Sequence, residues 1–308
     1  MHAQSSNPTP RGSLSGPDLA IVIGGALLLL GSFLPFYEID FLGEALDWTA
    51  WSNAWSFLPL LPLAVLLGAG SVVAVALERM GRATLPARVL GRPTEQVQLV
   101  GAALVAVTMV VFVLRVPESA SVAIGGWLCA AGSIAIVVGL ALGRRSDAST
   151  PAAAHGAGRV AVGARTPEAL AMVGGGVVVL LGSFLTVYEA GIDSPESMNA
   201  WAAEFRVLLL PVLLVLIAVV PVVLAVAGVR GEPTGLAGVP WTTVRTAAAG
   251  WGALAMVCYL VGEPFVSVDG LDIELARQLG FWLMLLGSLV AAGGAIHQER
   301  SPGPVVGI

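Results

Sequence analysis

The sequence predicts an all-α integral membrane protein, a helical bundle of eight transmembrane helices arranged as two parallel four-helix repeats. The 308 residues are 56% hydrophobic and 11% charged, with a mean hydropathy of +0.88. A soluble domain has about a quarter charged residues. Eight stretches are apolar enough to cross a bilayer, and the beginning of the chain is repeated near its middle.

A helix needs about 20 mostly apolar residues to cross the hydrocarbon core. The expected spans are Leu19 to Tyr37, Trp55 to Leu77, Val97 to Leu114, Ser119 to Leu142, Leu170 to Tyr188, Val207 to Val229, Thr246 to Val261 and Leu279 to Ile296. The first span lacks a small-residue cleavage site, so we expect a retained helix and not a signal peptide. None of the spans carries Asp, Glu, Arg or His well inside it.

An internal repeat divides the chain. Leu19 to Glu38 align without gaps on Leu170 to Glu189, with thirteen of 20 positions identical. The segments end in GSFLPFYE and GSFLTVYE, which chance similarity between apolar helices does not readily produce. Further matches join Leu60–Pro62 to Leu209–Pro211, while the third and seventh spans align poorly. Because each copy has an even number of spans, the repeats are expected to be parallel, related by an axis along the membrane normal.

The expected domains follow from this division. Residues 1–17 form a disordered cytoplasmic N-terminus, 18–143 the first four-span repeat and 144–167 a cytoplasmic linker rich in Ala, Gly and Ser. Residues 168–298 form the second repeat, and 299–308 a cytoplasmic tail. With the N-terminus inside, twelve arginines lie on the inner side and three on the outer side, whereas thirteen of the 20 acids lie outside. This follows the positive-inside rule and predicts cytoplasmic termini.

All 15 basic residues are arginine, which is typical of a GC-rich bacterial coding bias and predicts a bacterial plasma membrane protein. Cys129 and Cys258 lie in apolar runs, where buried thiols are expected rather than a disulfide. The three histidines have no partner at metal-ligand spacing, so neither a metal nor another cofactor is predicted. No nucleic-acid partner is expected, and the oligomeric state stays open.

Small residues indicate where helices pack, because membrane helices associate through close backbone contact. The candidate packing residues are Gly24, Gly25, Gly31, Gly175, Gly176, Gly182 and Gly287. A ligand lining or a hinge is the alternative for these glycines. Pro62 and Pro211 lie at equivalent depths and would either kink their helices or stand harmlessly near the helix starts.

The outer loops carry most of the polar character. The candidate surface residues for interaction with a partner are Tyr37, Glu38, Asp40, Tyr188, Glu189 and Asp193, which follow the first span of each repeat. The alternative is a solvated acidic face that only satisfies the charge rule. No phosphate-binding glycine loop, zinc-protease motif or serine-hydrolase motif is found.

The four-span unit resembles a group of small actinobacterial membrane proteins of mostly unknown function. The similarity lies in Gly-Ser-Phe-Leu ending the first span, an acidic outer loop, a proline-bearing second span, and Gly-x-Trp-Leu at Gly125 to Leu128. This chain differs in being duplicated. The resemblance implies a role at the cell envelope and supplies no catalytic residues.

The sequence therefore favours a non-enzymatic envelope protein, a scaffold or partner-binding subunit that presents acidic outer loops. Its partners would be the lipid bilayer and another envelope protein. The alternative is a permease or channel component with its pathway between the two repeats. Ionisable groups within the membrane usually mark ion and proton pathways, and their absence from the predicted spans weakens this alternative.

Overall fold

The computed structural model describes residues 15–41, 44–51, 60–79, 82–89, 92–114, 116, 120–148, 167–190, 196–201, 239–262, 265–268 and 271–300. Within these ranges the helices are α1 (Gly16–Phe33), α2 (Leu60–Arg79), α3 (Thr94–Leu114), α4 (Ile124–Ala148), α5 (Pro167–Phe184), α7 (Trp241–Val261) and α8 (Leu279–Arg300). Six of these described helices are long and apolar enough to span a membrane, and α5 contains the shorter apolar stretch Leu170–Phe184. The chain is thus a mostly helical, multi-pass membrane protein. The expected sixth span, Pro211 and Asp193 lie outside the described residues.

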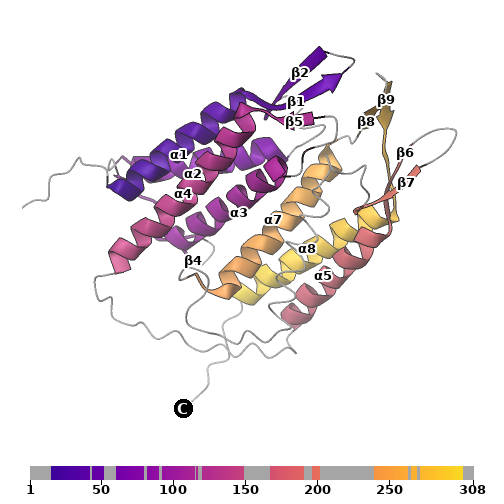
Figure 1. Cartoon of the computed structure of the whole chain (residues 1–308). Coiled ribbons are helices and arrows are strands. Elements are labelled where there is room, and N and C mark those ends of the chain that lie inside the picture. Colours follow the sequence, from indigo (N-terminus) through magenta and orange to yellow (C-terminus); the bar gives the residue numbers. More distant parts are fainter. Residues whose placement is uncertain are drawn as a thin grey trace, which may run out of the picture.

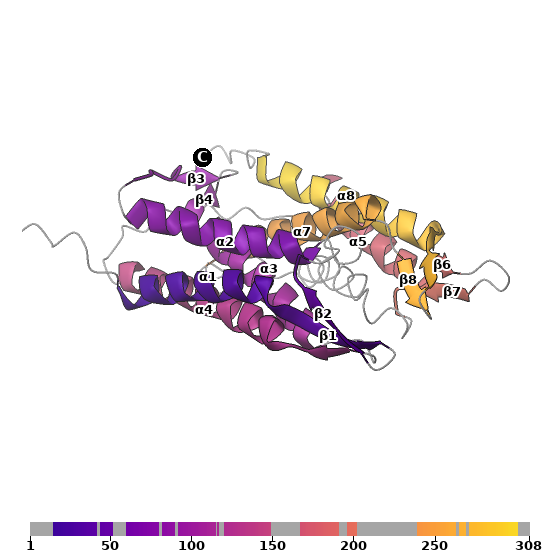
Figure 2. The ribbon, with the colours of Figure 1, turned by 90° about the horizontal axis from the view of Figure 1, so that it is seen from above.

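The helices form two neighbouring groups whose long axes run roughly side by side (Figure 1). The first group contains α1, α2, α3 and α4, and the second contains α5, α7 and α8, as the view from above also shows (Figure 2). Helix α3 contacts α7 and joins the groups. One end of the bundle carries most of the strands and is called the hairpin end; the other is called the opposite end.

Glycine brings α1 and α4 of the first group, and α5 and α8 of the second, into backbone contact. A methyl group placed on Gly24 of α1 would lie 2.6 Å from the carbonyl oxygen of Gly132 in α4. A methyl group placed on Gly175 of α5 would lie 2.5 Å from the carbonyl oxygen of Gly287 in α8. No larger residue fits at such a separation, so the glycines set how closely these helices approach.

The remaining glycines predicted to pack show the same crowding where contacts are described. Gly31 faces the backbone of Gly125, Gly182 faces that of Gly280, and Gly25 contacts Val72 of α2. Gly176 is buried in α5. These positions are the helix contacts of the bundle, and no ligand lining or hinge is needed to explain them.

The hairpin end contains strands where the sequence predicted helix ends and loops. A three-stranded antiparallel sheet has the order β2-β1-β5, from β1 (Pro35–Phe41), β2 (Glu44–Thr49) and β5 (Ala120–Val122). A second has the order β10-β6-β7, from β6 (Thr186–Ala190), β7 (Glu196–Asn199) and β10 (Ala276–Arg277). A hairpin of β8 (Phe265–Val268) and β9 (Leu271–Glu274) follows α7, and a short pair, β3 (Arg88–Val89) and β4 (Arg92–Pro93), precedes α3.

Several predicted helix boundaries are therefore wrong by a few residues. Helices α1 and α5 end at Phe33 and Phe184, and the Tyr-Glu pairs beyond them belong to strands. Pro35 explains why α1 ends at Phe33. A residue before proline avoids the helical region, and Leu34 is extended at φ −85° and ψ 162°. Helix α4 begins at Ile124 rather than Ser119, because Ala120–Val122 pairs with β1.

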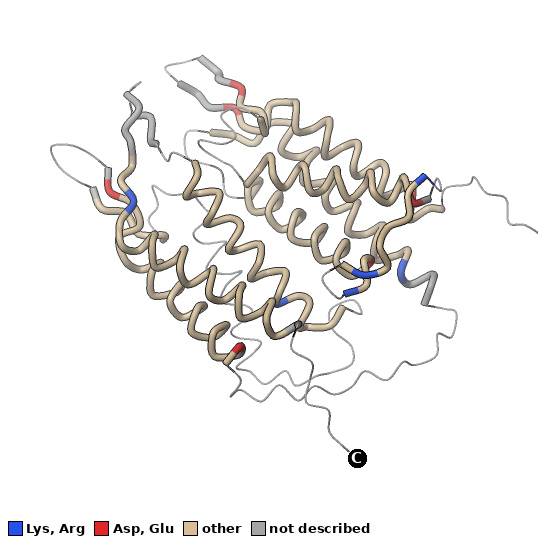
Figure 3. The backbone as a smooth tube through the Cα atoms, turned by 180° about the vertical axis from the view of Figure 1, so that it is seen from behind, with Lys and Arg blue, Asp and Glu red and all other residues tan. Residues whose placement is uncertain are grey.

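Charged residues of the described helices lie in their terminal turns, which leaves the middle of the bundle uncharged (Figure 3). Helix α7 starts earlier than predicted, at Trp241, and therefore includes Arg245 near its beginning. Helix α8 continues past the predicted Ile296, so that His297 is helical and its Nδ1 lies 3.2 Å from Oε1 of Glu168 in α5. His297 thus has a partner that the sequence did not indicate.

Candidate functional site

Each three-stranded sheet is attached to its helix by the same set of contacts. In the first group the indole Nε1 of Trp51 donates a hydrogen bond to Ser32 Oγ at 2.9 Å, and the Trp51 ring stacks on Phe33 with 5.7 Å between centroids. In the second group Trp201 Nε1 donates to Ser183 Oγ at 3.0 Å and stacks on Phe184 at 5.6 Å. Each arrangement is called a tryptophan lock below.

The locks explain the repeated Gly-Ser-Phe motif residue by residue. The glycine lets the neighbouring helix approach, the serine accepts the indole proton, and the phenylalanine stacks on the indole ring. The serine hydroxyl also donates to the helix, at 2.6 Å to Leu29 O and at 2.6 Å from Ser183 to Leu180 O. Backbone bonds from Ala50 to Ser32 O and from Ala200 to Ser183 O complete the attachment.

Strand alternation separates the two residues of each Tyr-Glu pair. Successive side chains of a strand point to opposite faces, and β1 and β6 are the central strands of their sheets. Tyr37 and Tyr188 point inward, with 4% and 1% of their surface exposed. Both tyrosines were predicted as outer-surface residues, and their burial shows that they are core residues instead.

A buried tyrosine in the first sheet and an arginine in the second connect the sheets to the ends of helices. The Tyr37 hydroxyl donates to the carbonyl oxygen of Phe112, in the last turn of α3, at 2.7 Å. Near Tyr188, Arg277 donates to Leu260 O at 3.1 Å and to Gly262 O at 2.5 Å, where α7 ends. Burial raises the pKa of both phenols well above the ordinary value, with Arg277 opposing part of this effect at Tyr188, so both remain protonated at neutral pH.

The hairpin-end carboxylates whose side chains the structure describes fall into two kinds. Glu38 is exposed and lies directly opposite the exposed Asp47 in the β1–β2 register. Like charges placed opposite one another destabilise a hairpin. Glu189 is half-buried and accepts a hydrogen bond of 2.5 Å from Gln278 Nε2. Asp40 belongs to β1, and only its backbone position is described. Glu38 and Asp47 thus form an exposed acidic pair at this end.

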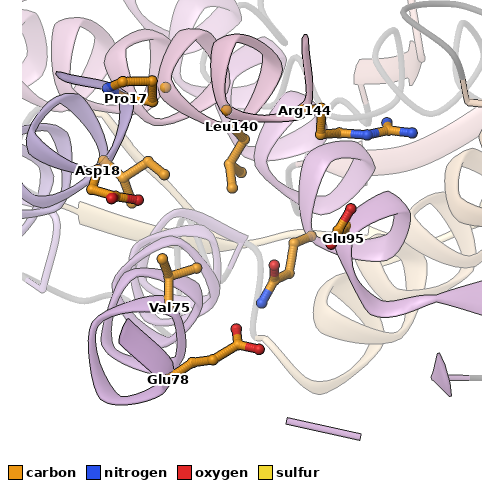
Figure 4. A pocket seen from close by; sticks show the side chains of 11 residues that line it. Pro17, Asp18, Val75, Glu78, Glu95, Leu140 and Arg144 are labelled. Atoms are coloured by element: carbon orange, nitrogen blue, oxygen red, sulfur yellow. The ribbon is translucent and has the colours of Figure 1, made fainter. Parts of the chain in front are cut away.

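A cavity of about 360 Å³ lies at the opposite end, among the four helices of the first group (Figure 4). Asp18 of α1, Glu78 of α2, Glu95 of α3 and Arg144 of α4 contribute charged groups to its lining. Apolar side chains from three helices complete the walls, namely Ile21, Val75 and Leu140. The cavity is partly open and combines both charges with an apolar interior.

Two groups of important residues were missed from the sequence. The locks could have been found from the tryptophan that follows Gly-Ser-Phe by a similar interval in each repeat, from Ser32 to Trp51 and from Ser183 to Trp201. The acids of the cavity carried no local signal, because Asp18, Glu78 and Glu95 lie far apart in the sequence and only helix packing brings them together.

No family model, curated protein or solved structure matches this chain. The resemblance to small four-span actinobacterial proteins therefore stays an expectation.

Proposed function

We propose that this chain is a non-enzymatic scaffold or partner-binding subunit of the bacterial plasma membrane. Eight helices, arranged as two parallel four-helix repeats, hold two β-sheets on the outer face while both termini lie in the cytoplasm. The partner would be an envelope protein with a basic surface. The observation that carries the proposal is the tryptophan lock, which is built twice and fixes an exposed sheet to an apolar helix each time.

Equivalent contacts support the duplication. The helix contact between Gly24 and Gly132 corresponds to that between Gly175 and Gly287, and the two locks correspond in every hydrogen bond described above. Each central strand also has the same irregularity in its register, between Pro35 and Tyr37 and between Thr186 and Tyr188. Independent origins would not reproduce such details.

The charge distribution supports the orientation. Among the described residues, Arg82, Arg88, Arg92 and Arg144 lie at the opposite end of the bundle, whereas Arg277 of β10 lies at the hairpin end together with Glu38 and Asp47. Arginine is enriched on the cytoplasmic side of bacterial membrane proteins. The hairpin end is accordingly the extracytoplasmic one.

The contact between the helix groups favours a scaffold over a permease. Helices α3 and α7 meet through buried apolar side chains that belong to one core cluster, including Met109, Phe112, Ala255 and Met256. Their described polar contact is a hydrogen bond of 3.2 Å from Trp251 Nε1 to Thr108 Oγ1, which satisfies the indole donor. In this part of the chain the interface between α3 and α7 is packed like a hydrophobic core, and its side chains do not form a pathway for a polar substrate.

A photo-cross-linking amino acid at Ser121, which is exposed on β5 opposite Glu38, tests the proposal. In cells it should give a discrete protein adduct, and the double variant Glu38→Gln/Asp47→Asn should lose most of it because the acidic pair is neutralised. The measurement is the yield of the adduct on a denaturing gel, together with its identification by mass spectrometry.

Two controls make this test specific. The variant Glu78→Gln/Glu95→Gln removes the same charge at the opposite end and should leave the adduct unchanged. A cross-linker at Leu30, an exposed residue in the apolar length of α1, should give only lipid adducts. An adduct at Ser121 that persists without the acidic pair would contradict an electrostatic docking surface.

A further inference from the structure

We infer that the cavity at the opposite end binds the headgroup of a zwitterionic aminophospholipid, with its ammonium group on the carboxylates and its phosphate near Arg144. This site is separate from the acidic hairpin end and does not depend on the proposed scaffold function. Three carboxylates and one guanidinium, supplied by four different helices, are among the residues that line the cavity (Figure 4).

The position of the cavity favours a lipid. Its lining comes from the start of α1, the end of α2, the start of α3 and the last turns of α4. The ends of membrane-spanning helices lie at the level of the lipid headgroups. Ile21, Val75 and Leu140 provide apolar walls, suited to the glycerol and upper chain region of a lipid rather than to a fully hydrated solute.

The carboxylates are placed to accept hydrogen bonds from an ammonium group. Among the described residues, Glu78 and Glu95 form no ion pair or hydrogen bond, and both are exposed. Asp18 is fixed by a capping box, in which its Oδ2 accepts bonds from Ser15 N at 3.2 Å and from Ser15 Oγ at 2.6 Å. A carboxylate only accepts, whereas a primary ammonium group offers three donors.

The charges that line the cavity favour some phospholipid headgroups over others. An anionic headgroup with no amine would face three carboxylates against one guanidinium, which is unfavourable. A choline group has no N–H to donate, so it gains less from carboxylates than an ethanolamine group does. The cavity of about 360 Å³ is in the size range of small-ligand pockets, roughly 300–1,000 Å³.

Native mass spectrometry of the full chain tests this assignment. The protein is released from nanodiscs containing equal amounts of ethanolamine, choline and glycerol phospholipids with identical acyl chains. We expect ethanolamine lipid to be retained about fivefold more than the others, equivalent to about 1 kcal/mol. Glu78→Gln/Glu95→Gln should abolish this preference, whereas Glu38→Gln/Asp47→Asn, which changes the charge equally at the hairpin end, should preserve it.

A second variant acts by filling space. A methyl group on Gly143 would lie 3.8 Å from its nearest neighbour, Pro17 Cβ, so Gly143→Val should occupy part of the cavity without a backbone clash and reduce retention of ethanolamine lipid. Free ethanolamine serves as the soluble probe. Equal retention of all three lipids by the wild type, or displacement of the bound lipid by low concentrations of free ethanolamine, would overturn the lipid assignment. Unchanged preference in the folded Glu78→Gln/Glu95→Gln protein would overturn the role of the carboxylates.

Discussion

Replacing Gly125 with valine should destabilise the protein by about 1–3 kcal/mol, the range for overpacking a well-filled core. A methyl group at this position would lie 2.5 Å from Pro35 O, 2.6 Å from Gly31 O and 2.7 Å from Leu34 O. All three are backbone atoms at the junction of α1 and β1, so no side chain can rotate away. We expect α4 to be displaced from α1, with a loss of unfolding free energy measured by denaturant titration in detergent micelles.

Gly101→Val is the matched control, because a methyl group on Gly101 of α3 would meet nothing within 4 Å. Its stability should change by less than about 0.5 kcal/mol, as for most surface substitutions. Gly280→Val should repeat the Gly125 effect, since a methyl group there would lie 2.6 Å from Thr186 O and 2.7 Å from Gly182 O. Equal stability of the Gly125 and Gly101 variants would contradict the close backbone contact.

The second large effect is expected from Trp251→Ala. Trp251 has 6% of its surface exposed and joins α7 to α3, both through packing and through the hydrogen bond to Thr108. Truncating a buried tryptophan typically costs about 3–5 kcal/mol, because a cavity remains. The variant should unfold at much lower denaturant concentration, and its two helix groups should separate first.

Two further variants separate the contribution of the hydrogen bond from that of the buried ring. Trp251→Phe retains most of the ring and loses the hydrogen bond, which in membrane proteins contributes about 0.6 kcal/mol on average. Trp127→Ala removes the same side chain from an exposed site on α4, where 55% of its surface is free, and should be nearly neutral. A Trp251→Ala protein as stable as Trp127→Ala would show that the contact between the groups does not depend on this residue.

Apolar length and composition were sufficient to predict the six described helices that are long and apolar enough to cross a membrane, because crossing a bilayer demands both. They were insufficient for the hairpin end. The first predicted span continued to Tyr37, whereas Pro35–Phe41 forms strand β1 through pairing with β2 and β5. That pairing is long-range, since β5 lies some 80 residues after β1.

The same limit applies to the candidate sites. Glycine spacing along single helices identified Gly24 and Gly31, but their partners Gly132 and Gly125 became visible only once α4 was placed beside α1. Tyr37 was assigned to the surface because it precedes an acid near a span end. No sequence pattern predicted that this segment is a strand. In a strand successive side chains alternate, so the Tyr37 ring lies in the core and Glu38 is exposed.

The central claim is a parallel duplication whose two sheets face the same side of the membrane. Single cysteines at Ser121 on β5, Ala276 on β10 and Thr84 between α2 and β3 are all at exposed positions and report on it directly. With Cys129 and Cys258 replaced, a membrane-impermeant maleimide should label Ser121→Cys and Ala276→Cys on intact cells, and Thr84→Cys only after permeabilisation. Labelling of only one of the two sheet positions would place the sheets on opposite sides of the membrane and contradict the parallel duplication.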